Sequence, residues 1–319
     1  MNRADKLPSI SVVIPVYGSQ DCLTMLVERL EPILQRVASE FELIFINDGS
    51  PDRSWEVIQT LRSRFHWITG LNLMRNYGQH NALLAGIRAA RYDLIITLDD
   101  DLQHPPEEIP KLLEALTDEL DVVYGYPTKE EHGVLRDLAS LITKVALQQS
   151  MHASTARRAS AFRLFRTSIR DSFASYDAPF VCIDVLLTWG TTRFHAIPVR
   201  HEPRTFGKSG YTMSKLVLHA LNMITGFTVI PLQIATIVGL GSTVFGLGVL
   251  IYTLVNYLIR GSAVPGFTFL ASSMAIFSGA QLLSLGIIGE YLARMHFRAM
   301  NKPVYTIRET TGGRTSASS

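Results

Sequence analysis

Two long stretches without charged residues near the C-terminus constrain the fold more than any other feature. The chain has 319 residues, and no Asp, Glu, Lys or Arg occurs between Lys215 and Arg260 or between Arg260 and Glu290. A helix needs about 20 mostly apolar residues to span a bilayer. We therefore predict spanning helices near 234–258 and 267–292, joined by a short link. The alternative is a pair of long core helices in a soluble protein, which rarely keeps two neighbouring segments so free of charge.

The charges around these stretches predict an orientation. Arg260 is the one charged residue in the link. The basic residues that flank the pair of helices on its outer ends are Lys208, Lys215, Arg294, Arg298, Lys302, Arg308 and Arg314. The positive-inside rule therefore places the N-terminal domain and both termini in the cytosol. We expect an integral protein of the inner or plasma membrane with two spans.

The composition argues against several classes of protein. The formal net charge is only +2, so no overall basic field points to nucleic acid. Cys22 and Cys182 are far apart and not in a metal-ligand spacing, which favours a reducing compartment without structural disulfides. The opening segment, MNRADKLPSISVVIPV, lacks the apolar region and cleavage site of a signal peptide.

Strand-like and helix-like segments alternate along the first part of the chain. The expected strands are 10–16, 41–47, 67–74, 93–99 and 121–126. Helical patterns of about 10 to 15 residues separate them, an alternation that predicts βαβ units and a mainly parallel sheet. In open sheets of this kind, ligands bind beyond the carboxyl ends of the strands.

Three consecutive carboxylates follow the fourth expected strand, in the segment TLDDDLQHPPEEIP. Asp99 and Asp101 are two residues apart as the chain leaves the strand, and Asp48 follows the second strand at the same edge. Hard oxygen ligands of this kind suit Mg²⁺ or Mn²⁺. The alternative is that Asp101 or His104 only caps the next helix. A cap alone does not explain three acids.

The nucleotide-binding loops of two large enzyme classes are absent. The sequence has no G-x-x-x-x-G-K-[ST] loop, and no G-x-G-x-x-G follows the first strand. Their absence argues against a P-loop NTPase and a dinucleotide-binding dehydrogenase. A nucleoside diphosphate held by a metal ion fits the acids better.

Five segments in a fixed order carry a family resemblance: IPVY, INDGSPD, RNYGQHNALLAG, TLDDDLQHPPEEIP and RTFGKSGY. In this order they resemble family 2 glycosyltransferases with the GT-A fold. The segment GIIGEYLAR at 286–294, within the second apolar stretch, resembles the polyprenyl-phosphate branch of that family. This branch includes dolichol-phosphate mannose synthase and bacterial undecaprenyl-phosphate sugar transferases.

The resemblance covers residues 10 to about 308 and implies an α/β fold with four parts. A GT-A domain, which is Rossmann-like with a mainly parallel sheet, would occupy 1–210 on the cytosolic side. An interfacial amphipathic segment would follow at 211–230, and two transmembrane helices would lie within 231–295. The remainder, 296–319, would be a cytosolic tail whose end, from Thr310, is disordered.

The resemblance also implies site residues. Those expected to bind the nucleotide sugar are Pro15, Val16, Tyr17, Asp48, Asp99, Asp100 and Gln103, with Asp99 and Asp101 as metal ligands. Those expected to bind phosphates are Arg136, Arg163, Arg204, Lys208 and Ser209. Catalysis would depend on Asp99, Asp101, Arg163 and Arg204. Plain packing is the alternative for Tyr17, and attraction to the membrane surface is the alternative for Lys208.

The chain departs from the family pattern at three places. Gly18 and Ser19 stand where the family usually has Asn-Glu, and Gly210 stands where it often has Lys. The segment ARRASAFRLFR, residues 156–166, resembles the family's S-G-F-R-x-x-R segment. Many members of the family carry an acid a few residues before it. Here the window 155–158 has no acid and contains arginines. Either that acid is not essential, or recognition of the donor or the acceptor differs. A phosphate acceptor makes the first interpretation tenable, because a phosphomonoester with a second pKa near ~6 is already mostly dianionic and hardly needs a general base.

The activity implied is inverting transfer of a sugar from a nucleotide-diphosphate sugar, with UDP favoured, to a polyprenyl phosphate at the cytosolic membrane face. Such a product would serve cell-envelope or glycan modification. Two alternatives stay open: an inactive GT-A-like membrane adaptor, and a glycosyltransferase that uses another membrane acceptor. A processive polysaccharide synthase is disfavoured, since no Arg-Trp pair is present. The sequence leaves open the sugar, the base, the prenyl length, a homo-oligomer and the downstream pathway.

Overall fold

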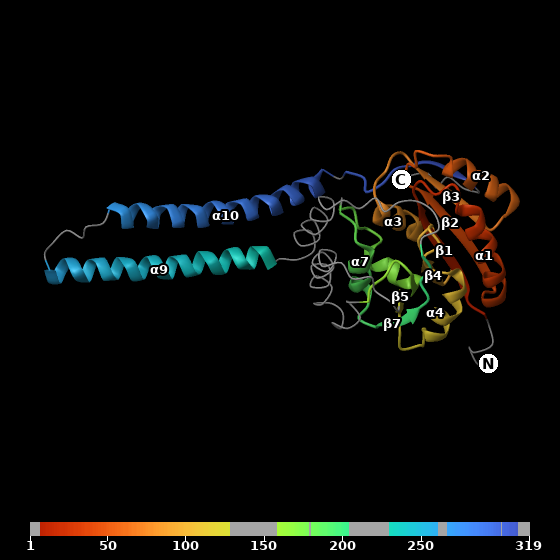
Figure 1. Cartoon of the computed structure of the whole chain (residues 1–319), viewed down its shortest axis with the longest axis horizontal. Helices are drawn as coiled ribbons and strands as arrows, with labels where there is room; N and C mark the ends of the chain where they lie inside the picture. The colour runs from red at the N-terminus through yellow and green to blue at the C-terminus, as the bar shows by residue number, and fades with distance from the viewer. Residues whose placement is uncertain are drawn as a thin grey trace. The chain divides into compact units, whose positions relative to one another are not determined.

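The structure is a computed structural model that describes residues 7–127, 158–178, 180–203, 230–260, 267–300 and 302–311. The chain divides into two units, which are shown in Figure 1 and described separately here. One unit contains residues 1–217 and 301–319, and the other contains residues 218–300. The predicted positions Arg136, Arg204, Lys208 and Ser209 lie outside the described residues, as do 211–229 of the expected interfacial segment.

Strands and helices alternate through the first unit as the sequence predicts. In chain order the first elements are β1 (Ser9–Val16), α1 (Leu23–Val37), β2 (Glu40–Asn47), α2 (Ser54–Arg64), β3 (Ile68–Leu73), α3 (Gln79–Ala89), β4 (Leu94–Thr97), the 3-10 helix η2 (Pro106–Glu108), α4 (Ile109–Ala115) and β5 (Val122–Pro127). The later elements are β6 (Arg163–Arg166), the 3-10 helix η3 (Thr167–Phe173), α7 (Ile183–Gly190), β7 (Phe194–Val199) and β8 (Ile307–Thr311). The five strands expected from the sequence are all present.

Within the described residues, eight strands form one sheet in the order β7-β5-β6-β4-β1-β2-β3-β8. Neighbouring strands from β4 through β1 and β2 to β3 are parallel, and β7 is parallel to β5. Strand β6 lies between β4 and β5 and is antiparallel to both. The carboxyl ends of the parallel strands and the first residue of β6 therefore meet at one edge of the sheet.

Helices cover both faces of this sheet (Figure 1). One face packs its apolar side chains, including Val12, Phe45 and Ile96, against α1, α2 and α4 in the main core. The opposite face lies under α3, which contacts β1 and β2, and α3 in turn contacts α7. The mainly parallel sheet with helices on both faces confirms the α/β class predicted from the sequence.

Helix α3 approaches the sheet closely through a glycine. A Cβ atom at Gly86 would lie 2.4 Å from Cγ1 of Val13 and 2.5 Å from Cδ1 of Ile46. Val13 is β-branched and fully buried, so it has little freedom to move away. The glycine thus sets how deeply α3 sits on the sheet. It also sets the height of the helix's first residues above the sheet's carboxyl edge.

Strand β8 is an element that the sequence analysis missed. It pairs antiparallel with β3, so that the chain returns to the sheet after the second apolar helix. Glu309 accepts hydrogen bonds from Trp55 Nε1 at 3.1 Å and Gln59 Nε2 at 3.3 Å. The expectation of disorder from Thr310 onward is wrong for Thr310 and Thr311, because both residues are paired in this strand.

The second unit consists of two long helices, α9 (Ile230–Arg260) and α10 (Phe267–Ala299). Both contain segments long and apolar enough to cross a membrane, Pro231–Ile259 and Ile276–His296. Their large apolar side chains are mostly exposed; Leu258, for example, is 73% exposed. Helices of a soluble core would bury such side chains, so that alternative does not fit. The helices pack on each other through the rings of Phe245 and Phe277, whose centroids are 6.4 Å apart.

Replacing Gly86 by alanine should destabilise the domain. Alanine is the better helix former by about 0.5–1 kcal/mol, but an overpacked core typically costs about 1–3 kcal/mol. We therefore expect Gly86→Ala to lower the thermal unfolding temperature of the detergent-purified protein by several degrees. Ala89→Ser, at an exposed position of the same helix, is the matched control and should leave it nearly unchanged. Equal stability of both variants would show that α3 does not press on Val13.

Candidate active site

A cleft lies at the carboxyl edge of the sheet, where β1 and β2 end. It has a volume of about 200 Å³. Its lining residues are Pro15, Val16, Tyr17, Asp48, Asn76, Gly78 and Gln79. Four of them are residues that the sequence analysis expects to bind the nucleotide sugar. The position agrees with the general location of ligands in open parallel sheets.

Asp48 is fixed in the wall of this cleft by the loop that precedes α3. Its side chain is nearly buried and accepts hydrogen bonds from the backbone N–H groups of Tyr77 at 2.7 Å and Gly78 at 2.8 Å. Burial raises the pKa of Asp48, while the two N–H groups and the charge of Arg75 act against that rise. The carboxylate thus organises the loop, and its predicted contact with a nucleoside stays a prediction.

The loop over Asp48 needs a glycine at position 49. Gly49 has a φ of 64°, and a Cβ atom there would lie 2.6 Å from the carbonyl carbon of Arg75. Any side chain would therefore push away the loop that supplies the two N–H donors to Asp48. The segment INDGSPD accordingly combines an acid with the one residue type that lets the loop come close.

The three acids after β4 have separate partners. Asp99 Oδ1 accepts a hydrogen bond from Gln79 Nε2 at 2.6 Å, and Asp100 Oδ2 accepts one from the N–H of Tyr17 at 3.2 Å. Asp101 Oδ1 accepts one from the N–H of Gln103 at 3.1 Å. Burial, with a smaller contribution from the charge of Asp101, raises the pKa of Asp100 to about 6. The acids thus fasten the ends of β1, β4 and α3 to one another.

Asp99, Asp100 and Asp101 begin a turn, here called the acid turn, whose backbone is unusual. Leu102 has a φ of 60°, the left-handed region that a residue with a branched side chain rarely occupies. Such a conformation costs about 1–3 kcal/mol and tends to occur at functional sites. No side chain caps η2 by a hydrogen bond, so the alternative that Asp101 or His104 serves only as a helix cap is not supported.

The acids fit an incompletely coordinated divalent cation. Asp99 and Asp101 are two residues apart in one turn and offer hard carboxylate oxygens, which suit Mg²⁺ or Mn²⁺. Among the described residues no group of three or more His, Cys, Asp and Glu side chains is gathered for a metal. A cation here would therefore take further ligands from water and from the phosphates of a bound nucleotide.

Arg163, the first residue of β6, is brought to the same edge by strand pairing. Its partners across the sheet are Thr97 on β4 and Tyr124 on β5. The side chain is only 2% exposed, and its Nε donates to the carbonyl oxygen of Ser160 at 3.0 Å. Its Nη2 lies 3.4 Å from Oδ1 of Asp184, while its buried Nη1 has no hydrogen-bond partner in the described part of the chain.

Asp184 and Tyr124 are residues that the sequence analysis missed. The hydroxyl of Tyr124 donates to the same Asp184 oxygen at 3.0 Å. Asp184 lies in the first turn of α7, in the apolar segment IDVLLTWG. A single acid at the start of an apolar helix has the local pattern of a helix terminus, so only the fold reveals its buried arginine partner.

His104 follows the acids in the chain and lies between two other aromatic rings. Its ring centroid is 5.1 Å from that of His201 and 5.6 Å from that of Phe162. Burial, followed by the charge of His201, lowers the pKa of His104 to about 4, so the imidazole is neutral at pH 7. Neither ring nitrogen has a hydrogen-bond partner within the residues the structure describes.

Comparison with known proteins places this architecture in a family. The family model described as Glycosyl transferase family 2 matches residues 11–173, which include most of β1, the acid turn and Arg163. The chain belongs to glycosyl transferase family 2. Its fold agrees with that of solved GT-A-like enzymes. Glucosyl-3-phosphoglycerate synthase from Mycobacterium tuberculosis, in complex with Mn²⁺, UDP and glucosyl-3-phosphoglycerate, aligns with a TM-score of 0.50 at 16% identity, over 68% of this chain and 78% of that one.

Two relatives match this glycosyltransferase over nearly its whole length. Undecaprenyl-phosphate 4-deoxy-4-formamido-L-arabinose transferase of Photorhabdus laumondii is 33% identical over 311 residues, 97% of this chain and 96% of that protein. The protein of the same name from Pseudomonas aeruginosa PAO1 is 34% identical over 311 residues, 97% of this chain and 92% of that protein. The similarity thus extends through the two apolar helices.

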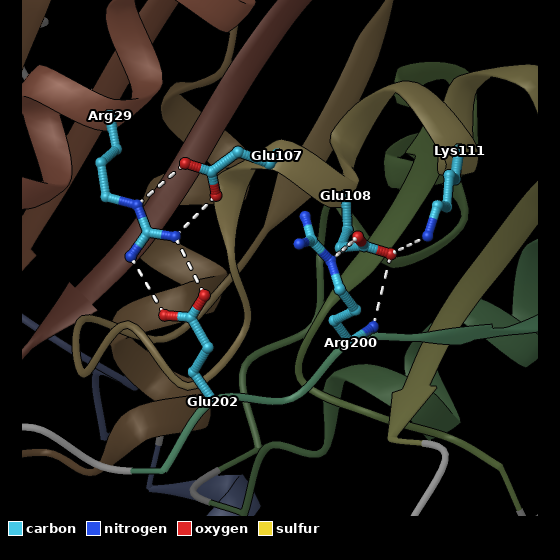
Figure 2. A network of polar contacts seen from close by, with 6 residues as sticks. All are labelled: Arg29, Glu107, Glu108, Lys111, Arg200 and Glu202. Carbon is cyan, nitrogen blue, oxygen red and sulfur yellow. Dashed lines mark hydrogen bonds and ion pairs between the residues drawn. The ribbon is translucent and has the colours of Figure 1, made fainter.

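A network of ion pairs holds the segment that follows β7 in this glycosyltransferase (Figure 2). Glu108 is buried and accepts hydrogen bonds from Arg200 Nε and Lys111 Nζ, both at 2.6 Å. Beside it, Arg29 pairs with Glu107 at 2.7 Å and with Glu202 at 3.3 Å. A further contact ties this segment to the acid turn, because the N–H of Glu202 donates to the carbonyl oxygen of Gln103 at 2.9 Å.

The segment held by these ion pairs directly precedes Arg204 in the chain. Arg204 follows Glu202 by two positions, so the start of the RTFGKSGY segment is covalently attached to a firmly held stretch next to the acid turn. The structure thus brings together Pro15 to Tyr17, Asp48, Asp99 to Asp101, Gln103 and Arg163 at one edge. Apart from the local Glu108–Lys111 pair, the network had no signal in the sequence. Arg200 lies 92 residues from Glu108, and Arg29 lies 78 residues from Glu107 and 173 from Glu202.

Loss of the Glu108 charge should weaken folding in a pH-dependent way. Burial acts to raise the pKa of Glu108, but hydrogen bonds from Lys111 and Arg200 outweigh it, so the folded pKa lies below the ordinary value of 4.5. The stabilisation is therefore complete above pH 4.5 and is lost as the pH falls through the lower folded pKa. Its partners are half-exposed and can be solvated, so we expect Glu108→Gln to cost about 1–3 kcal/mol at pH 7.

The test is thermal unfolding of wild type and Glu108→Gln between pH 7 and pH 3. The gap between the two melting temperatures should narrow below pH 4.5. Glu114→Gln, at an exposed position of the adjoining helix α4, should show no gap at any pH. A gap that stays constant to pH 3 would mean that the lost stability comes from packing rather than charge.

Proposed function

We propose that this glycosyltransferase moves a sugar from a nucleotide-diphosphate sugar, UDP-linked, to a polyprenyl phosphate at the cytosolic face of the membrane. The observation that carries the proposal is the identity of 33–34% over 97% of the chain to enzymes named undecaprenyl-phosphate sugar transferases. Undecaprenyl phosphate is therefore the acceptor we propose. The exposed apolar helices are consistent with an acceptor that resides in the bilayer.

The residues of the sheet edge have distinct proposed roles. Pro15, Val16, Tyr17 and Asp48 line the cleft and would receive the nucleoside. Asp99 and Asp101 would hold Mg²⁺ or Mn²⁺, with Asp100 and Gln103 shaping the turn between them and the nucleotide. The support for a metal is chemical, together with the Mn²⁺ and UDP bound by the mycobacterial synthase of similar fold. A bound cation would supply charge that stabilises the departing diphosphate.

The basic residues complete the proposed reaction. Arg136, Arg163, Arg204, Lys208 and Ser209 would bind the phosphates of donor and acceptor. A phosphate oxygen of the lipid attacks the anomeric carbon as its bond to the diphosphate breaks, so a single displacement inverts the configuration. The attacking phosphate is already mostly dianionic, and the step needs no proton acceptor. In the window 155–158, where the family resemblance leads us to expect an acid, this chain carries Arg157 and Arg158, and these residues are compatible with such chemistry.

The metal site gives the sharpest test of the enzymatic proposal. We expect Asp99→Ala or Asp101→Ala to lower transfer of radiolabelled sugar into lipid at least about a hundredfold, because each removes a ligand of the ion that stabilises the leaving group. Asp93→Ala, at the opposite end of β4, is the matched control and should keep its activity. UDP-4-deoxy-4-formamido-L-arabinose is the first donor to assay, followed by a panel of UDP- and GDP-sugars.

Two outcomes would count against this proposal. Near wild-type activity in the presence of EDTA would contradict the proposed role of a metal ion. Transfer to no lipid phosphate with any donor of the panel, by folded and membrane-inserted protein, would favour the inactive adaptor. Transfer to another membrane molecule in extracted lipids would replace the polyprenyl phosphate as the acceptor.

The pairing of β8 with β3 supports a proposed topology. Residues on both sides of the two apolar helices belong to one sheet, so an even number of spans must separate them. With two spans, the N-terminal domain and the C-terminal strand share one side. The basic flanks, set against the single Arg260 in the link, support the cytosol as that side.

Cysteine labelling in intact cells tests the topology. The native cysteines are both buried and should not react. A cysteine introduced by Ser262→Cys in the link should react with a membrane-impermeant maleimide, whereas one introduced by Asp5→Cys should react only after the cells are opened. Labelling at position 5 without labelling at position 262 would reverse the proposed orientation.

A further inference from the structure

Arg163 is a buried cation with one described counter-charge. Its side chain is 2% exposed and that of Asp184 is 13% exposed. Among the described residues, Asp184 supplies the carboxylate within ion-pair distance. A buried guanidinium without a carboxylate would have a desolvation cost of several kcal/mol. Asp184 thus accounts for why the arginine can stay at the sheet edge rather than turn toward water.

The arrangement uses only part of the guanidinium. Nε is committed to the carbonyl oxygen of Ser160 and Nη2 faces Asp184, whose position is further held by the hydroxyl of Tyr124. Nη1 is buried and has no hydrogen-bond partner within the described residues. Buried donors are nearly always satisfied, so an unsatisfied one needs an explanation such as a missing ligand. A phosphate oxygen is the ligand chemistry that a guanidinium donor suits best.

Contacts along the first turn of α3 link this arginine to the acid turn. Gln79 donates to Asp99, and the next residue, His80, accepts the N–H of Ile183 on its Nδ1 at 3.3 Å. Ile183 directly precedes Asp184. The first turn of α3 therefore holds both Asp99, the expected metal ligand, and helix α7, which carries Asp184. The basic and acidic sides of the site are held at a set distance from each other.

We propose that Asp184 is a positioning residue, which orients Arg163 so that Nη1 binds a phosphate oxygen of the lipid acceptor or of the donor diphosphate. This rests on the proposed function.

A purely structural ion pair is the competing explanation. Both explanations predict that Asp184→Asn lowers stability, so stability cannot separate them. A positioning role makes a further claim, that Asp184 affects ligand binding only through Arg163. Two changes that act through one contact are not additive, which a double-mutant cycle measures.

The experiment measures binding of undecaprenyl phosphate in detergent micelles and, separately, of UDP with Mn²⁺. The variants are Arg163→Lys, Asp184→Asn and the two combined. We expect each single change to weaken one of the two ligands about tenfold, the value of one charge-assisted hydrogen bond. The combined variant should be no weaker than either. The ligand that loses affinity shows whether the phosphate is that of the lipid or that of the donor.

Asp121→Asn is the matched control. Asp121 is also a buried acid paired with an arginine, Arg193 at 2.7 Å, but it lies just before β5, at the opposite end of the strand from the carboxyl edge. The Asp121→Asn variant should lower stability and leave the affinities for undecaprenyl phosphate and for UDP with Mn²⁺ unchanged. Should Asp184→Asn fail to fold, Tyr124→Phe and Asp184→Glu replace it. Each keeps a carboxylate while disturbing its placement, so each should weaken the same ligand a few-fold.

Two results would overturn the inference. In the first, Arg163→Lys weakens a ligand while Asp184→Asn behaves like Asp121→Asn. In the second, the losses of the single variants multiply in the combined one. A failure of the wild type to bind undecaprenyl phosphate would instead contradict the proposed acceptor, and the UDP–Mn²⁺ measurements would then decide the inference alone.

Discussion

The antiparallel pairing of β6 between β4 and β5 is the constraint on which the site depends. Strand β6 runs opposite to β4 and β5, so its first residue lies beside the carboxyl ends of these two strands. The register places Arg163 opposite Thr97, two residues before Asp99, and next to Tyr124. A shift by one residue would turn the arginine to the other face, into the apolar core that Phe162 and Leu164 occupy.

The same edge must also accommodate three adjacent negative charges. It does so by giving each acid a different donor: the amide of Gln79, the backbone of Tyr17 and the backbone of Gln103. These donors come from α3, from the end of β1 and from the turn itself. Mutual repulsion is thereby balanced by contacts that hold three segments together. The strained backbone of Leu102 is tolerated in this setting because its surroundings fix it.

Local sequence patterns predicted the acidic part of this site but not the pairing of Arg163 with Asp184. The acids follow an apolar strand, so their place at the sheet edge could be inferred from sequence order alone. Arg163 was identified through a family resemblance, but its burial and its pairing with Asp184 depend on β6 and α7 meeting in space. Strand β8 was missed for the same reason, because its partner β3 precedes it by more than 230 residues and its polar sequence has no apolar alternation. Pairings of this kind are decided by the whole fold.

Strand β8 has a further physical consequence. Without it β3 would be an open edge, a row of unpaired backbone groups that invites pairing with another chain. Strand β8 covers that edge with the segment that follows α10, so the last position of the sheet is filled only after the chain has passed through both apolar helices. The eight-stranded sheet is therefore complete only when residues from both sides of those helices are present.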